Sequence, residues 1–277
     1  MNIKIITDTS SEFSKEEKIK YNISTFDMPI YFEDNEYVDI DIQIVWQALL
    51  DGKKITTSQP SRENIKEEFE NAKNNGYAVI CILISSALSG TYETAINVKN
   101  EVDYENIYII DSLSATMGEH ILVKEACKLR DLGYTANDIF KKLEELKKHI
   151  KIYACIDSLK YLALGGRIPS AVAMIGNMLN LKPIIEVNKN GEIKVVSKKI
   201  GLIKSIKEIV NLIKKDTINE EYNMISLFAC DNINANKLIS SIKDNKICDN
   251  INAPREIGHV IGTHIGPGGF GVVYVKK

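Results

Sequence analysis

The hydrophobic pattern is clearest around an uncharged run, residues 77–84, that is rich in β-branched side chains. Such a run is typical of a strand covered on both faces, as in a parallel sheet. From Thr91 onwards the apolar positions change to helical spacing, with Tyr92, Ala95 and Ile96 on one face. The pattern therefore predicts a buried strand, a short polar loop and then a helix.

Strands and helices alternate through the first 150 residues, which is typical of a parallel sheet. The other expected elements are strands at 3–6 and 107–110 and helices that begin near 61 and 135 and cover 121–132. Residues 22–56 depart from the pattern, with short extended pieces, an acidic turn and one short helix. We interpret them as a small β-rich insertion.

The pattern changes beyond residue 150. The expected elements are a strand at 152–156, a helix at 171–181 that is buried or lines a hollow, a hairpin at 182–197, a helix at 202–214, a strand at 224–228, a helix at 235–242 and a final strand pair around a glycine-rich loop. The sequence thus predicts an α/β domain at 1–150, with a parallel sheet, and an α+β domain at 151–277, with an antiparallel sheet.

Polar side chains follow each expected parallel strand, at Thr7-Asp8, Ser85-Ser86 and Asp111-Ser112. Open α/β sheets place their ligands at this carboxyl edge. The group that begins at Thr7 either forms a second side of the pocket or caps a helix.

The junction after Ser85 also offers the unpaired N–H groups and the positive dipole of a helix N-terminus. The hydroxyls of Ser89 and Thr91 add donors, and Gly90 would allow close approach to the backbone. The junction therefore predicts an anion site. The alternative is that Ser89 or Thr91 only caps the helix.

Two further segments carry candidate chemistry. Residues 56–59 are four polar residues before an expected helix, and Ser61 accounts for the N-cap without them. Residues 258–271 combine two histidines with several glycines. We therefore expect their backbone to lie close to another group, either of the protein or of a ligand, and His264 to face that group. The segment matches neither a Walker loop nor a dinucleotide fingerprint.

The chain of 277 residues is 44% hydrophobic and 26% charged, which suffices for a large core and favours two domains. The net charge of −2 gives no electrostatic reason to expect nucleic acid or an anionic membrane as partner. Five widely spaced cysteines indicate reduced thiols and no metal site. The chain starts with a strand, and no apolar run approaches the roughly 18 residues of a membrane span, so we expect a cytoplasmic protein that is not integral to a membrane.

Five motifs occur in order: Thr57-Ser-Gln-Pro-Ser61, Ser85-Ser-x-Leu-Ser-Gly-Thr91, Asp111-Ser112, Tyr161-Leu-x-x-Gly-Gly-Arg-Ile168 and Gly262-Thr-His-x-Gly-Pro-Gly268. With this order and spacing the chain resembles the DegV family from end to end. The resemblance implies a non-catalytic protein whose two domains enclose one long-chain fatty acid and which needs no cofactor. It also implies, as for some members, a subunit that presents the acyl carboxylate to an ATP-dependent fatty acid kinase.

By the same resemblance, Thr57 and Ser89 would bond the carboxylate, with Ser58, Gly90 and His264 close by. Thr91 belongs to the same candidate site. Arg167 would lie at the mouth, where the kinase docks or the acyl phosphate is held. Similar proteins that serve the kinase tend to carry a second arginine after the hairpin, where this chain has Leu202. That departure leaves the identity of the partner open.

Two other functions compete with fatty-acid binding. A serine hydrolase could use Ser89, Asp111 and His264 in the chain order of α/β-hydrolases, although the segment around Ser89 lacks the first glycine of the nucleophile elbow. A sensor of another amphiphilic or phosphorylated ligand could use the same pocket.

Overall fold

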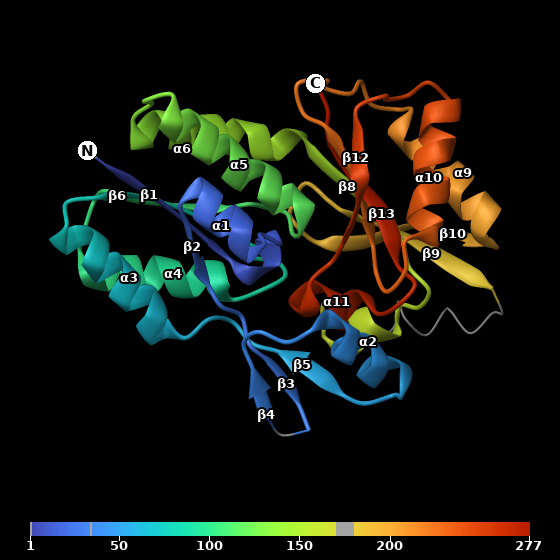
Figure 1. Cartoon of the computed structure of the whole chain (residues 1–277), viewed down its shortest axis with the longest axis horizontal. Coiled ribbons are helices and arrows are strands. Elements are labelled where there is room, and N and C mark those ends of the chain that lie inside the picture. The colour runs from blue at the N-terminus through green and yellow to red at the C-terminus, as the bar shows by residue number, and fades with distance from the viewer. Residues whose placement is uncertain (1, 34, 170–179) are drawn as a thin grey trace. The chain divides into compact units, whose positions relative to one another are not determined.

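A computed structural model describes residues 2–33, 35–169 and 180–277, and Figure 1 shows the chain. The expected helix at 171–181 falls almost wholly outside the described residues. Two compact units make up the chain. The first comprises Met1–Pro29, Thr57–Lys148 and Lys189–Gly191, and the second comprises Ile30–Thr56, His149–Asn188 and Glu192–Lys277. The units are therefore discontinuous, whereas the expected domains followed chain order with a boundary at 150.

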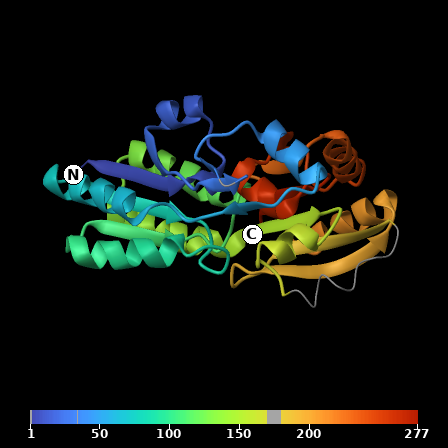
Figure 2. The same ribbon diagram turned by 90° about the horizontal axis from the view of Figure 1, so that it is seen from below.

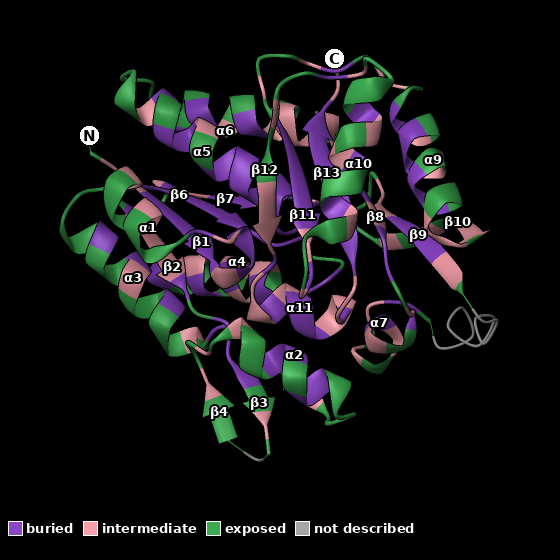
Figure 3. Cartoon of the chain, turned by 45° about the vertical axis from the view of Figure 1, so that its right-hand side comes forward, coloured by how far each residue is buried: buried purple, intermediate pink, exposed green. Residues whose placement is uncertain are grey.

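A four-stranded parallel sheet forms the centre of the first unit. Its order is β2 (Ile23–Phe26), β1 (Ile3–Asp8), β6 (Ala78–Leu83) and β7 (Ile107–Asp111). All six residues of β6 are buried, as the uncharged run predicts (Figure 3). The assignment of residues 22–56 to an insertion was wrong for β2, because this strand pairs with β1 and extends the main sheet.

Helices cover both faces of this sheet. The helices α3 (Arg62–Asn74) and α4 (Thr91–Val102) pack on one face, where Phe69 and Val98 join a cluster with alternate strand residues. The helices α5 (Met117–Asp131) and α6 (Ala136–Leu146) contact the strands from the other side, as Figure 1 shows in green. The expected N-cap of α3 is confirmed, because Ser61 Oγ accepts the Asn64 N–H at 3.1 Å. Between β1 and β2 lie a 3₁₀ turn, Thr9–Ser11, and α1 (Lys15–Tyr21).

The second unit is built on a six-stranded sheet. Its order is β10 (Ile193–Ile200), β9 (Leu181–Val187), β8 (Ile150–Cys155), β13 (Phe270–Val275), β11 (Met224–Phe228) and β12 (Ile251–Glu256). Its pairs are antiparallel except β11 with β12. The two expected final strands are present as β12 and β13, but they lie on opposite sides of β11 and do not pair with each other. The helices α9 (Leu202–Ile213) and α10 (Ile233–Asp244) supply apolar side chains to one core cluster with the sheet.

The described residues of the second unit also include three short helices and a small sheet. The sheet has the order β4 (Asn35–Tyr37), β3 (Ile30–Phe32) and β5 (Ile55–Thr57), and the helices are α2 (Ile42–Leu50), α7 (Lys160–Leu164) and α11 (His259–Ile265). Figure 1 and Figure 2 both show α2 beside α11. Trp46 of α2 is buried there, so close to Gly262 that a Cβ on residue 262 would lie 2.6 Å from the indole ring.

The glycine-rich segment was expected to be a loop, and this prediction was wrong for residues 259–265. They form α11, with Gly262 N donating to Gly258 O at 2.8 Å and Gly266 N to Gly262 O at 2.8 Å. The glycines permit close packing against α2 and α7 instead of a flexible backbone. Among the described helices, each is too short or too polar to cross a membrane.

Candidate ligand-binding site

The loop between β6 and α4 is held in place by hydrogen bonds on several sides. Ser85 is buried, and its hydroxyl donates to Gly191 O at 2.9 Å while it accepts the Ala87 N–H at 3.2 Å. The next residue, Ser86, donates from its N–H and its hydroxyl to the two carboxylate oxygens of Asp111, at 3.1 and 2.5 Å. The residues at the end of the buried strand therefore fix the path of the loop before it reaches Ser89.

Asp111 acts on this loop as an acceptor only. Its Oδ1 accepts the N–H groups of Ser86 and Leu113, and its Oδ2 accepts the Ser86 hydroxyl. The hydrolase alternative instead needs this carboxylate to orient an imidazole. These contacts give Asp111 a positioning role and do not favour the hydrolase.

Ser89, Gly90 and Thr91 form the N-terminus of α4. The N-cap is Gly90, which has no side chain with which to cap the helix. The Ser89 hydroxyl lies 2.9 Å from the Thr91 hydroxyl and accepts the Thr91 N–H at 3.4 Å, and both side chains are buried. Neither Ser89 nor Thr91 is the N-cap residue, although Ser89 Oγ accepts the first N–H of the helix, so the junction places a pair of hydroxyls at the helix N-terminus.

The polar segment before α3 adjoins this junction within the first unit. Thr57 ends β5, and the N–H of Ser58 donates to Pro29 O at 3.0 Å. Gln59 Oε1 accepts the Thr94 hydroxyl at 3.2 Å and occupies the space that a Cβ on Gly90 would need. Gln59 thus joins the segment containing Thr57 and Ser58 to the first turn of α4, a contact that residue spacing alone does not reveal.

His264 and Arg167 lie close together in the second unit. Burial, followed by the positive charge of Arg167, lowers the pKa of His264 to about 4. Burial also lowers the pKa of Arg167, whose guanidinium donates to Gly165 O. His264 is therefore a neutral imidazole at physiological pH and can exchange hydrogen bonds with a polar group without adding charge.

Glycines bring the motifs around Tyr161 and His264 into contact. A Cβ on Gly165 would lie 2.1 Å from His264 Nδ1, and a Cβ on Gly266 would lie 2.1 Å from the ring of Tyr161. Gly266 also has a φ of +74°, which favours glycine. Arg167 and His264 belong to the second unit and the hydroxyls to the first, so their union in one site stays a prediction.

The polar residues after β1 are used within the protein, as the second of the two expected alternatives proposed. Asp8 caps the 3₁₀ turn by accepting the Ser10 N–H at 2.9 Å. The Thr7 hydroxyl donates to Oε1 of the buried Glu119 at 2.8 Å, and the Ser10 hydroxyl lies 2.6 Å from its Oε2. Sequence reasoning missed Glu119, because nothing in its spacing on α5 distinguishes it from an exposed helix residue.

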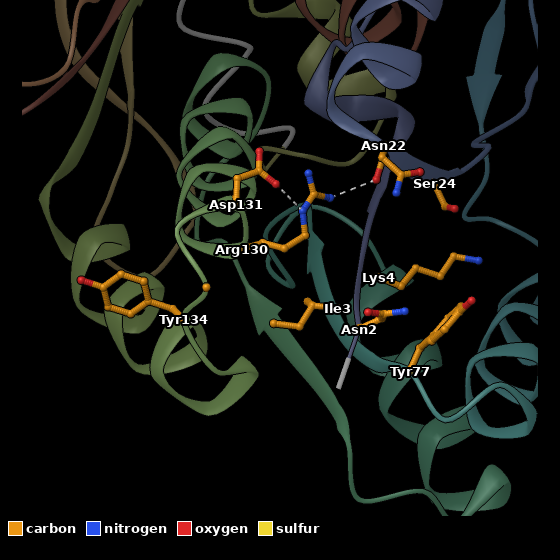
Figure 4. A pocket seen from close by; sticks show the side chains of 10 residues that line it. Asn2, Ile3, Lys4, Asn22, Ser24, Tyr77, Arg130, Asp131 and Tyr134 are labelled. Atoms are coloured by element: carbon orange, nitrogen blue, oxygen red, sulfur yellow. Dashed lines mark hydrogen bonds and ion pairs between the residues drawn. The ribbon is translucent and has the colours of Figure 1, made fainter.

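A cavity of about 690 Å³ opens at the amino ends of β1 and β6, at the opposite end of the strands from Ser85 (Figure 4). Its two cationic side chains are already paired, Lys4 with Glu68 and Arg130 with Asp131. None of the predicted ligand residues lines it. Over the described ranges, no group of three or more histidine, cysteine or acidic side chains could hold a metal ion.

Comparisons with known proteins agree with this arrangement of motifs. The sequence model described as "Uncharacterised protein, DegV family" matches residues 2–277. The chain belongs to the DegV family. A DegV domain-containing protein of Clostridium acetobutylicum is 35% identical over 99% of each chain.

Solved DegV-family structures share the fold. DegV of Bacillus subtilis, described as a fatty acid binding protein, has 29% identity and a TM-score of 0.84 over the whole of both chains. The Fatty Acid Kinase (Fak) B3 protein of Streptococcus pneumoniae, loaded with linoleic acid, has 19% identity and a TM-score of 0.86, again over both whole chains. Family membership and the predicted fold class, a parallel α/β sheet with a second, mainly antiparallel sheet, are thus confirmed.

Proposed function

We propose that this protein binds one long-chain fatty acid and that Thr57, Ser58 and the Ser89–Thr91 segment hold its carboxylate. The observation that carries the proposal is the buried hydroxyl pair of Ser89 and Thr91 at the N-terminus of α4, where the N-cap residue is Gly90. His264 as a further contact and Arg167 at the mouth remain part of the proposal.

The chemistry of this junction suits a carboxylate. Burying a charged carboxylate is costly unless several donors bond it. Helix N–H groups and the hydroxyls of Ser89 and Thr91 supply such donors, and the helix dipole adds a partial positive charge. Hydroxyl donors are neutral, so they leave no buried positive charge unpaired when the ligand leaves the site.

The acyl chain would supply most of the affinity. Each buried CH₂ contributes about 0.8 kcal/mol, so a chain of sixteen or so carbons outweighs the polar contacts, which fix orientation. The volume of the side chains around the acyl chain would then select its length.

The proposed partner is an ATP-dependent fatty acid kinase, for which this protein would be the non-catalytic, acyl-presenting subunit. The structural likeness to the Fak B3 protein is the support for this partner. Leu202, at the start of α9, stands near the place where similar proteins carry a second arginine. This departure weakens the support for that same kinase as the partner.

The test is the lipid content of the purified protein. Native mass spectrometry should show one fatty acid per chain, and organic extraction should release it intact. Ser89→Ala should lower this load. Ser14→Ala is the matched control, because Ser14 caps α1 in the same unit and its loss costs about 0.5–2 kcal/mol without touching the site. An equal load in Ser89→Ala, or a fluorophosphonate adduct on Ser89, would overturn the proposal.

A further inference from the structure

Two carboxyl groups share one hydroxyl inside the first unit. Ser10 Oγ lies 2.6 Å from Asp8 Oδ1 and 2.6 Å from Glu119 Oε2. All three residues are completely buried. Asp8 ends β1, whereas Glu119 lies in the first turn of α5, so the fold brings them together from positions 111 residues apart in the printed sequence.

Hydrogen counting shows that this cluster holds an extra proton. A serine hydroxyl has one hydrogen to donate and can accept others, whereas an ionised carboxylate only accepts. If Asp8 and Glu119 were both ionised, the Ser10 hydroxyl could satisfy only one of its two short contacts. The other would set two oxygen acceptors against each other at 2.6 Å in a buried site. One carboxyl group must therefore be protonated and donate to Ser10.

The remaining contacts assign the proton to Glu119. Asp8 faces two backbone N–H groups, which can donate a hydrogen bond but cannot accept one. Its Oδ1 accepts the Ser10 N–H and its Oδ2 accepts the Ile84 N–H, each at 2.9 Å. The other partner of Glu119 is the Thr7 hydroxyl, which donates to Oε1 at 2.8 Å and leaves Oε2 able to carry the hydrogen. Asp8 is thus the carboxylate, and Glu119 is the acid.

Other titratable groups around the pair favour the same state. Burial is the main cause that raises the pKa of Glu119 well above its ordinary value, and the charge of Asp8 raises it further. Cys81 of β6 is also buried, and burial with the two nearby acids raises its thiol pKa, so it stays neutral. Glu12 adds negative charge from beyond the 3₁₀ turn. The neighbouring His120 instead faces Ser11 O, at 3.0 Å, and stacks on Phe13.

We propose that Glu119 is protonated at neutral pH and that this proton lets Asp8 hold the Ile84 N–H and so position the Ser85–Thr91 loop. Ile84 directly precedes that loop, and Asp111 holds it from the strand on the other side of β6. An ionised Glu119 would compete with Asp8 for the one hydrogen of the Ser10 hydroxyl, and its charge would oppose an anion at the loop. The effect on ligand retention rests on the proposed function, whereas the proton assignment does not.

Two amide substitutions test the assignment by opposite outcomes. In Glu119→Gln the amide can donate to Ser10 Oγ and accept from Thr7, which reproduces the pattern of the acid. In Asp8→Asn the amide would face a backbone N–H, so a donor meets a donor. We expect urea unfolding at pH 7 to place the midpoint of Glu119→Gln at or above that of the wild type. For Asp8→Asn we expect an unfolding equilibrium constant raised about tenfold or more. Equal losses, or the reverse order, would overturn the proposal.

A second measurement applies even if Asp8→Asn does not fold. Because the folded protein keeps a proton that the unfolded chain releases above the ordinary glutamate pKa of 4.5, wild-type stability should fall as the pH rises from there. Glu119→Gln should lack this fall. Infrared spectra at pH 7 should show the carbonyl band of a protonated carboxyl group that the same variant removes. A band or pH slope that persists in Glu119→Gln refutes the assignment.

Ligand content separates this inference from the proposed function. An infrared band lost in Glu119→Gln, from protein without bound fatty acid, would support the proton assignment while the proposed function failed. Wild-type protein that carries a fatty acid but shows no such band would support the proposed function and overturn the proton assignment.

Discussion

The imidazole of His264 lies directly against the Cα of Gly165, because a Cβ there would fall 2.1 Å from His264 Nδ1. Gly165→Ala should therefore displace the ring and cost about 1–3 kcal/mol of stability through overpacking. Heteronuclear NMR of the histidine ring should show its resonances shifted. The matched control is Gly166→Ala, which meets no atom within 4 Å but carries the strain of a φ of +74°. It should destabilise the protein while the ring resonances stay in place.

His264 should titrate far below an ordinary histidine. An NMR titration is expected to give a midpoint near pH 4, because burial and then Arg167 disfavour the charged ring. The folded-state pKa lies below the ordinary value of 6.5, so the unfolded chain binds the extra proton first. Stability present above pH 6.5 should be lost as the pH falls towards 4, and His264→Gln should reduce that loss. A midpoint near 6.5 would contradict the buried environment.

Thr57→Val should reduce the fatty-acid load of the purified protein. The substitution keeps the β-branched shape at the end of β5 and removes one hydroxyl from the proposed carboxylate contacts. Thr56→Val is the matched control, since Thr56 is the neighbouring residue on the same strand and is exposed. Lipid extraction with mass spectrometry compares the two, and an identical load in both variants would remove Thr57 from the site.

Asp111→Asn should loosen the loop after β6. The amide nitrogen cannot accept either the Ser86 hydroxyl or the backbone N–H groups, so at least one donor loses its partner. The expected cost is about 1–3 kcal/mol in chemical denaturation. Hydrogen exchange should be faster at Ser86 and Leu113, and unchanged protection there would contradict the positioning role.

The sequence was most informative where the local pattern of residues determines the structure of a single element. The uncharged run at 77–84 and the N-cap at Ser61 depend on local patterns, and both were predicted correctly. The hydroxyls after β6 could be placed at the sheet edge because parallel strands end together. Their direct contacts with Asp111 and Gln59 could not be predicted, because hydrogen-bond partners depend on the fold of segments distant in sequence.

Other predictions failed where tertiary packing outweighs local propensity. Glycines at 258, 262 and 266 indicated a loop, yet close packing of Trp46 against Gly262 accompanies a helix there. The short strand at 23–26 looked like part of an insertion, because its pairing with β1 is visible only in the fold. Glu119 gave no signal at all, since an acidic residue in the first helical turn is usual on a surface.

The chain passes from one unit to the other at residues 29–30, 56–57, 148–149, 188–189 and 191–192. A gene cut at codon 150 would therefore not yield two autonomous fragments. The amino-terminal product would carry α2 without α11, leaving the indole of Trp46 to water, and the carboxyl-terminal product would lack the helix that packs on Gly262. Biosynthesis has the same constraint, because the second unit cannot be completed until the ribosome has delivered the last strand.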